Sequence, residues 1–180
     1  MNDQGLTVGA KRILVAAIFY LIWGGIGILG SLLTFTGALG FVLGDGSLVV
    51  GFASLFGGLF NVVIGIAALQ NRFKAENAWF LKILGFLDLA YIAMMIVASI
   101  LETTTSVADP AIAETAAVFS VCGMILPIII AIVFIRGASA NHTQHKNSEL
   151  PTSHSSQILG TAFIGATTLF LVLSAIFNFM

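Results

Sequence analysis

One carboxylic acid stands in the middle of a long apolar stretch of this chain. Between Ala78 and Leu101 the charged residues are Asp88 and Lys82, and Asp88 lies near the centre. An ionisable side chain at such a position costs roughly 3 kcal/mol in a lipid environment, so it must face protein or water. Because desolvation penalises the charged form, a buried carboxyl group tends to keep its proton and can then donate a hydrogen bond. Asp88 is therefore the first candidate for a functional group.

Three further polar residues are expected at the depth of Asp88. Asn61 lies about as far before the short connection at residues 70–77 as Asp88 lies after it, and Tyr20 and Thr168, with its neighbour Thr167, fall in the same layer. We predict an intramembrane polar site of Asp88, Asn61, Tyr20 and Thr168. Three interpretations stay open: a protonatable or cation-binding site in a transport path, a neutral acid that holds helices together, and an acid hydrated near the membrane rim.

The chain offers little other chemistry. Hydrolysis inside a membrane requires a nucleophile with a base, or clustered metal ligands, and Asp88 has no second acid or histidine in the apolar stretches. His142 and His145 have a helical metal-ligand spacing but no cysteine near them, and the single Cys122 excludes an intramolecular disulfide. The sequence predicts no catalytic residues, no metal site and no cofactor, and we expect a protein that is not an enzyme.

The composition is that of a membrane protein. Of the 180 residues, 58% are hydrophobic and 8% are charged, with a mean hydropathy of +1.07, whereas soluble domains carry roughly 25% charged residues. So few charges cannot cover a water-soluble fold, and there is no basic stripe for nucleic acid. We therefore expect residues 1–180 to form one domain in the cell membrane, with the lipid bilayer as its first partner.

Five apolar stretches are long enough to cross a bilayer as helices. A spanning helix needs about 20 residues, and each stretch is much longer than the roughly 9 to 11 residues of a barrel strand. The sequence thus predicts an all-α fold, an integral membrane bundle of five transmembrane helices. The expected spans are residues 13–35, 48–69, 78–101, 116–135 and 158–180.

The placement of charge predicts an orientation. If the chain alternates across the membrane, all seven cations fall on one side: Lys11, Arg12, Arg72, Lys74, Lys82, Arg136 and Lys146. The connections on the other side carry acids alone: Asp45, Glu102, Asp109 and Glu114. Because cationic loops stay in the cytoplasm, the N-terminus is expected inside and, with five spans, the C-terminus outside.

The connections differ in character. The short one at residues 70–77 predicts a tight antiparallel hairpin of the second and third helices. Residues 36–47 are too apolar for an ordinary loop, so this stretch either extends the first helix or re-enters the membrane. Residues 137–157 are rich in Ser, Thr, Asn, Gln and His and include Pro151. Such a composition predicts a flexible cytoplasmic connector.

Small residues recur at alternating spacings of three and four along three of the predicted helices. In lipid, helices associate through close backbone approach rather than through apolar burial, so these stripes predict packing faces. The stripes of the first and second helices are expected to face each other, and a weaker stripe runs along the last helix. The predicted packing residues are Gly24, Gly27, Gly51, Gly58, Gly65 and Gly165.

These features favour a non-enzymatic function. The glycine stripes and the lack of catalytic groups are typical of an accessory, scaffold or regulatory membrane subunit, whose partner would be another membrane protein or a second copy of the chain. The alternative is a small transporter or channel that uses Asp88 as its protonatable carboxyl group.

Overall fold

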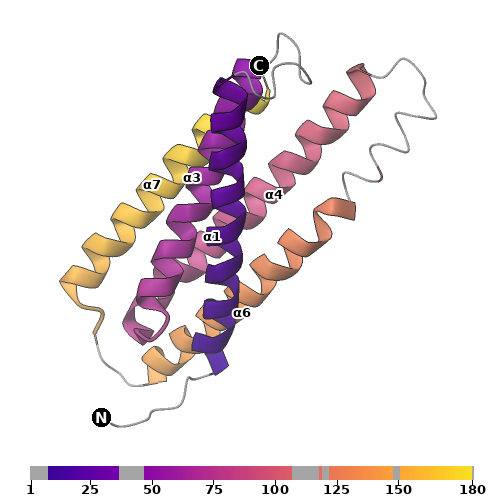
Figure 1. Cartoon of the computed structure of the whole chain (residues 1–180). Coiled ribbons are helices and arrows are strands. Elements are labelled where there is room, and N and C mark those ends of the chain that lie inside the picture. Colours follow the sequence, from indigo (N-terminus) through magenta and orange to yellow (C-terminus); the bar gives the residue numbers. More distant parts are fainter. Residues whose placement is uncertain (1–7, 37–46, 107–117, 119–121, 148–150, 180) are drawn as a thin grey trace.

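The computed structural model describes residues 8–36, 47–106, 118, 122–147 and 151–179, and it is helical throughout most of these ranges. Five helices in the described part are long and apolar enough to cross a membrane, which confirms that part of the prediction. The elements are α1 (Val8–Phe35), α3 (Ser47–Asn71), the 3-10 turn η2 (Ala75–Asn77), α4 (Ala78–Ser106), α6 (Ile125–Asn147) and α7 (His154–Asn178) (Figure 1).

The largest departure from the predicted spans concerns α6. This helix runs from Ile125 to Asn147, whereas residues 116–135 were expected. The flexible connector predicted over residues 137–157 is therefore wrong for its first half. Gly137, Ala138 and Asn141 are buried on one face of α6, and the polar residues lie on its other faces. Of the stretch 36–47, all but its two end residues lies outside the described part of the chain.

The helices form two groups that lie side by side. α3 packs mainly on α1 and, with another face, on α7, while α4 packs on α6 and α7 (Figure 1). α6 also contacts α1, which joins the groups. The predicted tight hairpin of α3 with α4 is wrong, because the stripe of α3 is occupied by α1 and the surface that α3 shares with α4 is small.

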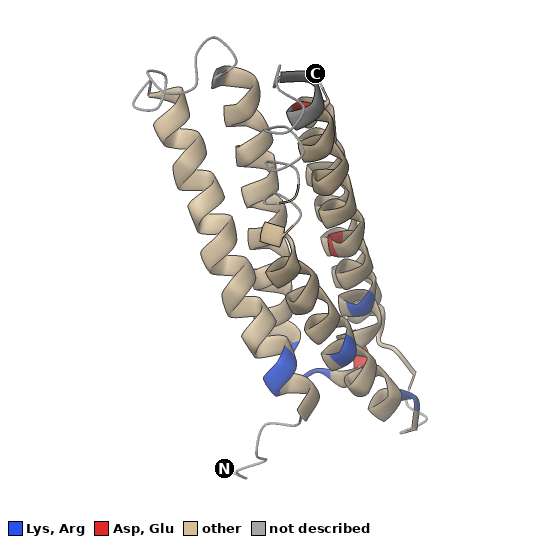
Figure 2. Ribbon diagram, turned by 90° about the vertical axis from the view of Figure 1, so that its right-hand side faces the viewer, with Lys and Arg blue, Asp and Glu red and all other residues tan. Residues whose placement is uncertain are grey.

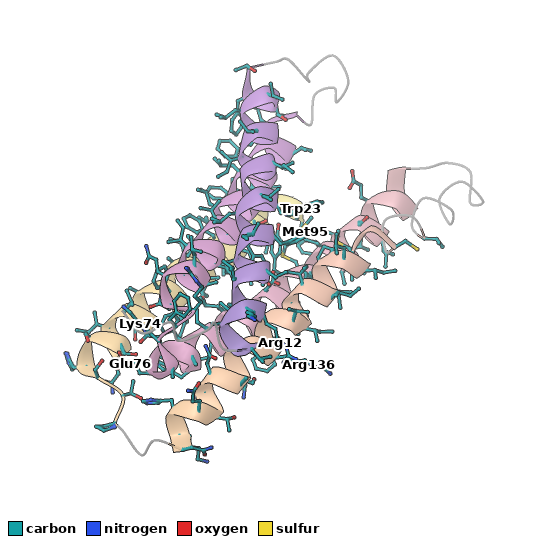
Figure 3. All side chains as sticks on the ribbon, turned by 60° about the horizontal axis from the view of Figure 1, so that its bottom comes forward. Arg12, Trp23, Lys74, Glu76, Met95 and Arg136 are labelled. Atoms are coloured by element: carbon teal, nitrogen blue, oxygen red, sulfur yellow. The ribbon has the colours of Figure 1, made fainter. Side chains whose placement is uncertain are left out.

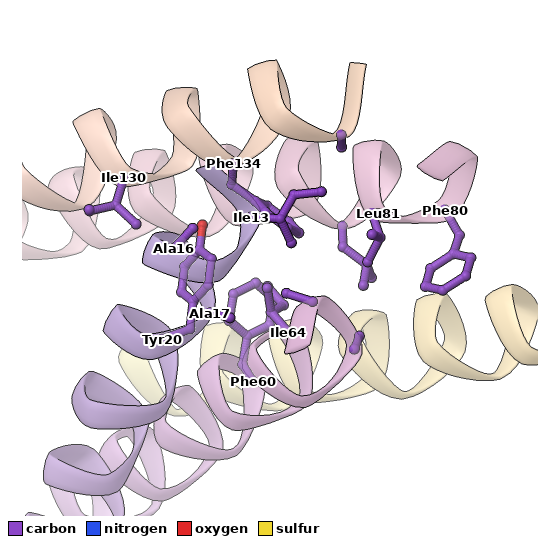
Figure 4. Close-up of a cluster of buried hydrophobic side chains, with 14 residues drawn as sticks. Ile13, Ala16, Ala17, Tyr20, Phe60, Ile64, Phe80, Leu81, Ile130 and Phe134 are labelled. Atoms are coloured by element: carbon purple, nitrogen blue, oxygen red, sulfur yellow. The ribbon is translucent and has the colours of Figure 1, made fainter. Parts of the chain in front are cut away.

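The charges and the core divide the bundle into two halves. Lys and Arg gather toward one end (Figure 2), and the half that carries all seven is called the basic half below. The buried apolar cluster lies in this half and includes Ile13, Ile64, Phe80 and Phe134 (Figure 4). Toward the opposite half, α4 and α6 lean away from α1 and α3 (Figures 1 and 3).

Candidate functional site

A hydrogen bond joins Tyr20 of α1 to Asp88 of α4. The Tyr20 hydroxyl donates to Asp88 Oδ2 over 2.6 Å, and both side chains are 2% exposed. α1 and α4 share little other surface. The pair therefore acts as a direct tie between the two groups of helices, at mid-length of the bundle.

The apolar core surrounds this pair on the side of the basic half. The ring of Tyr20 meets Phe134 of α6 edge to face, with centroids 5.6 Å apart and planes at 78°. Figure 4 shows Tyr20 between Ala16, Ala17 and Ile130, with further apolar side chains toward the basic half. The carboxyl group of Asp88 is thus held in a dry environment in which a single donor of good geometry matters.

The other two predicted members of the polar site take different positions. Asn61 is buried on α3, but its Nδ2 donates to the Gly57 carbonyl of its own helix over 2.9 Å. Thr168 is exposed, so its inclusion in the site is wrong. Its neighbour Thr167 faces inward, and the Thr167 hydroxyl donates to the Phe163 carbonyl of the same helix over 2.7 Å. The geometry joins two of the four predicted residues, Tyr20 and Asp88.

Tyr91 is a site residue that the sequence analysis missed. It follows Asp88 by three residues on α4, and its ring stacks on Phe60 of α3 with centroids 4.5 Å apart. Its hydroxyl lies against Gly57, where any Cβ would collide with it, and Ser174 Oγ of α7 is 3.6 Å from that Cβ position. The spacing of three from Asp88 was the available signal, since residues three apart share a helix face.

A cavity of about 840 Å³ lies between α1, α3 and α4, in the half opposite to the basic one. Trp23 and Gly30 line it from α1, Asn61 from α3, and Tyr91 and Met95 from α4. Trp23 on α1 and Met95 on α4 are labelled in Figure 3. Glu102 and Phe177 also line the cavity. Its volume is in the range of small-molecule sites, roughly 300–1,000 Å³.

The predicted stripes of α1 and α3 face each other in the structure. A Cβ built on Gly58 would lie 2.8 Å from Ile28 N and 2.9 Å from the Gly24 carbonyl oxygen. The Ser54 hydroxyl of α3 donates to the Gly27 carbonyl across this seam over 3.2 Å. Gly51 and Gly65 lie equally close to side chains of α1. The two helix backbones approach each other closely. At these positions there is no room for any side chain larger than the hydrogen of glycine.

Gly165 does not belong to a packing face within the chain. Apart from the backbone of its own helix, no described atom lies within 4 Å of a Cβ built on it. Thr161, Thr168 and Val172, which share its stripe, are exposed as well. The inward face of α7 is instead formed by Ser156, Gly160, Thr167 and Ser174. The sequence predicted a packing face along this stripe, and within the described chain no helix covers it, because α7 carries a second, parallel set of small residues that faces the bundle.

Three buried asparagines, here called the asparagine clasp, hold the helix ends together in the basic half: Asn71, Asn77 and Asn141. Asn141 Nδ2 of α6 donates to the Arg72 carbonyl over 2.9 Å. Asn77 Nδ2 donates to Asn71 Oδ1 over 2.7 Å, across the turn before α4. The clasp was not predicted, although amides at the ends of apolar stretches are a recognisable signal for cross-helix hydrogen bonds.

The described residues contain no group of three histidines, cysteines or acids that would hold a metal ion. His142 and His145 lie on α6, one turn apart, because the helix extends through them. Cys122 is exposed. Comparison of the chain with protein-family models, curated proteins and solved structures finds no match. The candidate site therefore consists of the Tyr20–Asp88 pair, the adjoining cavity and the exposed face of α7.

Proposed function

We propose that the chain is a multi-pass protein of the cell membrane, with its N-terminus and basic half toward the cytoplasm and its C-terminus outside. Two observations support this proposal. Five helices have the length and apolarity of membrane spans, and the seven cations lie in one half of the bundle. Cationic connections are retained on the cytoplasmic side, which gives the bundle its direction.

Within that membrane, we propose a non-enzymatic role as an accessory, scaffold or regulatory subunit that binds its partner through α7. The observation that carries this proposal is the exposed stripe of Thr161, Gly165 and Thr168 on α7, here called the α7 stripe. In the apolar 18-residue segment of α7, 17% of the residues are buried within the chain, compared with 39% in the corresponding segment of α3. Small residues at helical spacing let a second helix approach closely in lipid.

The contrast between two glycines sharpens this assignment. A Cβ on Gly58 would collide with α1, so this small-residue face of α3 is already covered by a helix of the same chain. Gly165 has the same chemistry and is open to a helix from outside. The partner is accordingly a transmembrane helix, either of another membrane protein or of a second copy of this chain.

The experiment that tests this role compares Gly165→Leu with Gly25→Leu. Gly25 of α1 is a matched control, because a Cβ built on it also meets no described atom outside its own helix backbone within 4 Å. Native mass spectrometry of complexes extracted from the expressing membrane gives the particle mass. We expect the unaltered chain in a particle heavier than the 18.9 kDa of one copy. Gly165→Leu should release the single chain, and Gly25→Leu should not.

Two outcomes would contradict the proposed role. One is an unaltered chain that is extracted as a single copy at every detergent concentration. The other is a heavier particle that Gly165→Leu leaves intact, since the partner would then bind elsewhere.

A second candidate function is a small carrier or channel that uses Asp88. The cavity favours it, because the cavity reaches Asn61 and Tyr91, and Tyr91 is one helical turn from Asp88. The apolar core between Asp88 and the basic end of the bundle counts against it, since a proton or ion would have to cross that core. The geometry therefore favours the subunit role over the carrier role.

A further inference from the structure

The cavity in the half opposite to the basic one has aromatic walls. Trp23 of α1, Tyr91 of α4 and Phe177 of α7 line it together. An aromatic face attracts a cation within about 6 Å of the ring centroid, and the attraction increases when the cation is desolvated. Met95 and Ile26 add apolar, adaptable surface. These walls fit an apolar ligand and favour one with positive charge.

Among the residues that the structure describes, charge in this half has a single sign. Glu102 of α4 lines the cavity, and all seven lysines and arginines belong to the basic half. In surroundings of low dielectric, such an unbalanced distribution attracts positive ligands over a longer distance than in water.

The inner end of the cavity is polar. Asn61 lines it, and because its Nδ2 is bonded to the Gly57 carbonyl, its Oδ1 is the atom that remains to accept a hydrogen bond from a ligand. Ser54 also lines the cavity, and its hydroxyl already donates to Gly27 across the seam. A ligand is thus offered acceptors and aromatic rings, each of which already stacks on a neighbouring ring, but no cationic group from the described lining residues.

We propose that this cavity is a binding site for an amphipathic organic cation, a molecule with a bulky apolar or aromatic body and a delocalised positive charge. The body occupies the space between Trp23 and Met95, and the charge is stabilised by the aromatic faces and Glu102. A simple metal cation is disfavoured, because Glu102 is the one acid among the described lining residues, and the described residues contain no group of three histidines, cysteines or acids that could hold a metal ion. The site goes beyond the proposed subunit role, which depends on the α7 stripe.

A pair of probes with opposite charge tests the proposal. Tetraphenylphosphonium and tetraphenylborate have nearly the same shape, and they differ in the sign of their charge. Equilibrium dialysis with the full chain in nanodiscs of zwitterionic lipid measures the binding of each probe, and empty nanodiscs give the amount that partitions into lipid. We expect saturable binding of tetraphenylphosphonium above that background and none of tetraphenylborate.

Two variants assign the binding to the cavity. Glu102→Gln removes the charge and should weaken tetraphenylphosphonium binding roughly tenfold. Gly30→Leu should narrow the cavity and weaken the binding, because the nearest atom to a Cβ on Gly30 is Ser54 Oγ at 3.9 Å and the larger side chain is accommodated. Gly25→Leu carries the same change on α1 at a residue outside the cavity lining and should bind normally.

The result that overturns the proposal is equal binding of both probes, or tetraphenylphosphonium binding that neither Glu102→Gln nor Gly30→Leu changes. The test uses the isolated protein, and Gly165→Leu should leave probe binding unchanged. Failure of the cavity proposal is thereby distinguishable from failure of the α7 partner surface.

Discussion

At the scale of single residues, the Tyr20–Asp88 bond is the feature that the proposed membrane location would constrain most strongly. An acid at mid-span has to be satisfied by the protein, and a tyrosine from a helix that otherwise barely touches α4 provides the donor. The 2.6 Å distance and the apolar surroundings make this bond a structural tie by geometry. Proton transfer between Asp88 and the basic end of the bundle would require a path across the apolar core.

Removing the donor should cost more than replacing the carboxyl group by an amide. Tyr20→Phe leaves the buried carboxyl group of Asp88 without its partner, and we expect a loss of about 1–3 kcal/mol in the free energy of unfolding. Asp88→Asn keeps an acceptor oxygen for the Tyr20 hydroxyl, so the loss should stay below about 1 kcal/mol. Reversible unfolding in mixed micelles, followed by circular dichroism, measures both values.

Controls separate the structural tie from a carrier. Thr168→Val removes an exposed hydroxyl and should leave stability unchanged. In vesicles with an imposed pH gradient, Asp88→Asn should not alter proton or ion flux if the acid is structural. A loss of pH-dependent flux in a stably folded Asp88→Asn protein would instead establish the carrier function.

Sequence reasoning succeeded for single residues where the cost of burial decides the outcome. Asp88 and Tyr20 could be paired because an acid and a hydroxyl at similar depth need each other in lipid. Thr168 was misplaced because threonine can satisfy its hydroxyl within its own helix, as Thr167 does, and so can face either way. The clasp residue Asn141 was missed because it was assigned to a connector.

At the scale of elements, the α1–α3 seam organises the bundle. These two helices share the largest surface in the described chain, and their glycines bring the backbones together. The cross-seam bond from Ser54 to the Gly27 carbonyl is possible because of this approach. The seam was predictable since both stripes have the same alternating spacing, which keeps small residues on one face over several turns.

A single methyl group in the seam should be disruptive. A Cβ at Gly58 would meet Ile28 N at 2.8 Å and the Gly24 oxygen at 2.9 Å, and neither backbone atom can rotate away. We expect Gly58→Ala to lower the free energy of unfolding by about 1–3 kcal/mol through overpacking. Gly25→Ala, on the open face of α1, should leave it unchanged or raise it slightly. Thermal unfolding of both variants in the same detergent makes the comparison, and equal stability of the two would show that the seam is looser than described.

Two elements show where periodicity fails as a guide. α7 carries small residues on two faces, and spacing alone cannot tell which face meets α3 and which meets lipid. α6 continues past Arg136 into a polar segment because Gly137 lies against Gly9 and Arg12 of α1, so tertiary contact overrides composition. Both features depend on the neighbours of a helix, which a single sequence does not specify.

At the scale of the whole molecule, the two halves of the bundle have different characters. The basic half combines the apolar core, the asparagine clasp and the start of α7, where Ser153 caps the helix by accepting from Ser156 N. The opposite half contains the cavity. The number of helices, their apolar character and the charge asymmetry could be predicted from the sequence. The direction in which α4 leans away from α1 and α3 could not, because it depends on which helices pack against one another.

The charge asymmetry leads to a prediction about topology. In a chain with Cys122→Ser, single cysteines are introduced by Lys146→Cys at the end of α6 and by Phe179→Cys after α7; both parent side chains are exposed. A membrane-impermeant maleimide applied to intact cells should label residue 179 directly. It should label residue 146 only after the membrane is permeabilised, because the cations hold that end in the cytoplasm.

A third position makes the topology test independent of the last helix. Lys74→Cys lies in the exposed turn between α3 and α4, at the same end of the bundle as residue 146. If the positive charges determine the orientation, residues 74 and 146 must behave alike and opposite to residue 179. Labelling of residues 74 and 146 from outside would mean that the protein has the opposite orientation, with the cavity on the cytoplasmic side. Labelling of residue 74 but not 146 would mean that the chain does not cross the membrane five times, and the bundle in Figure 1 would then not be the membrane-inserted form.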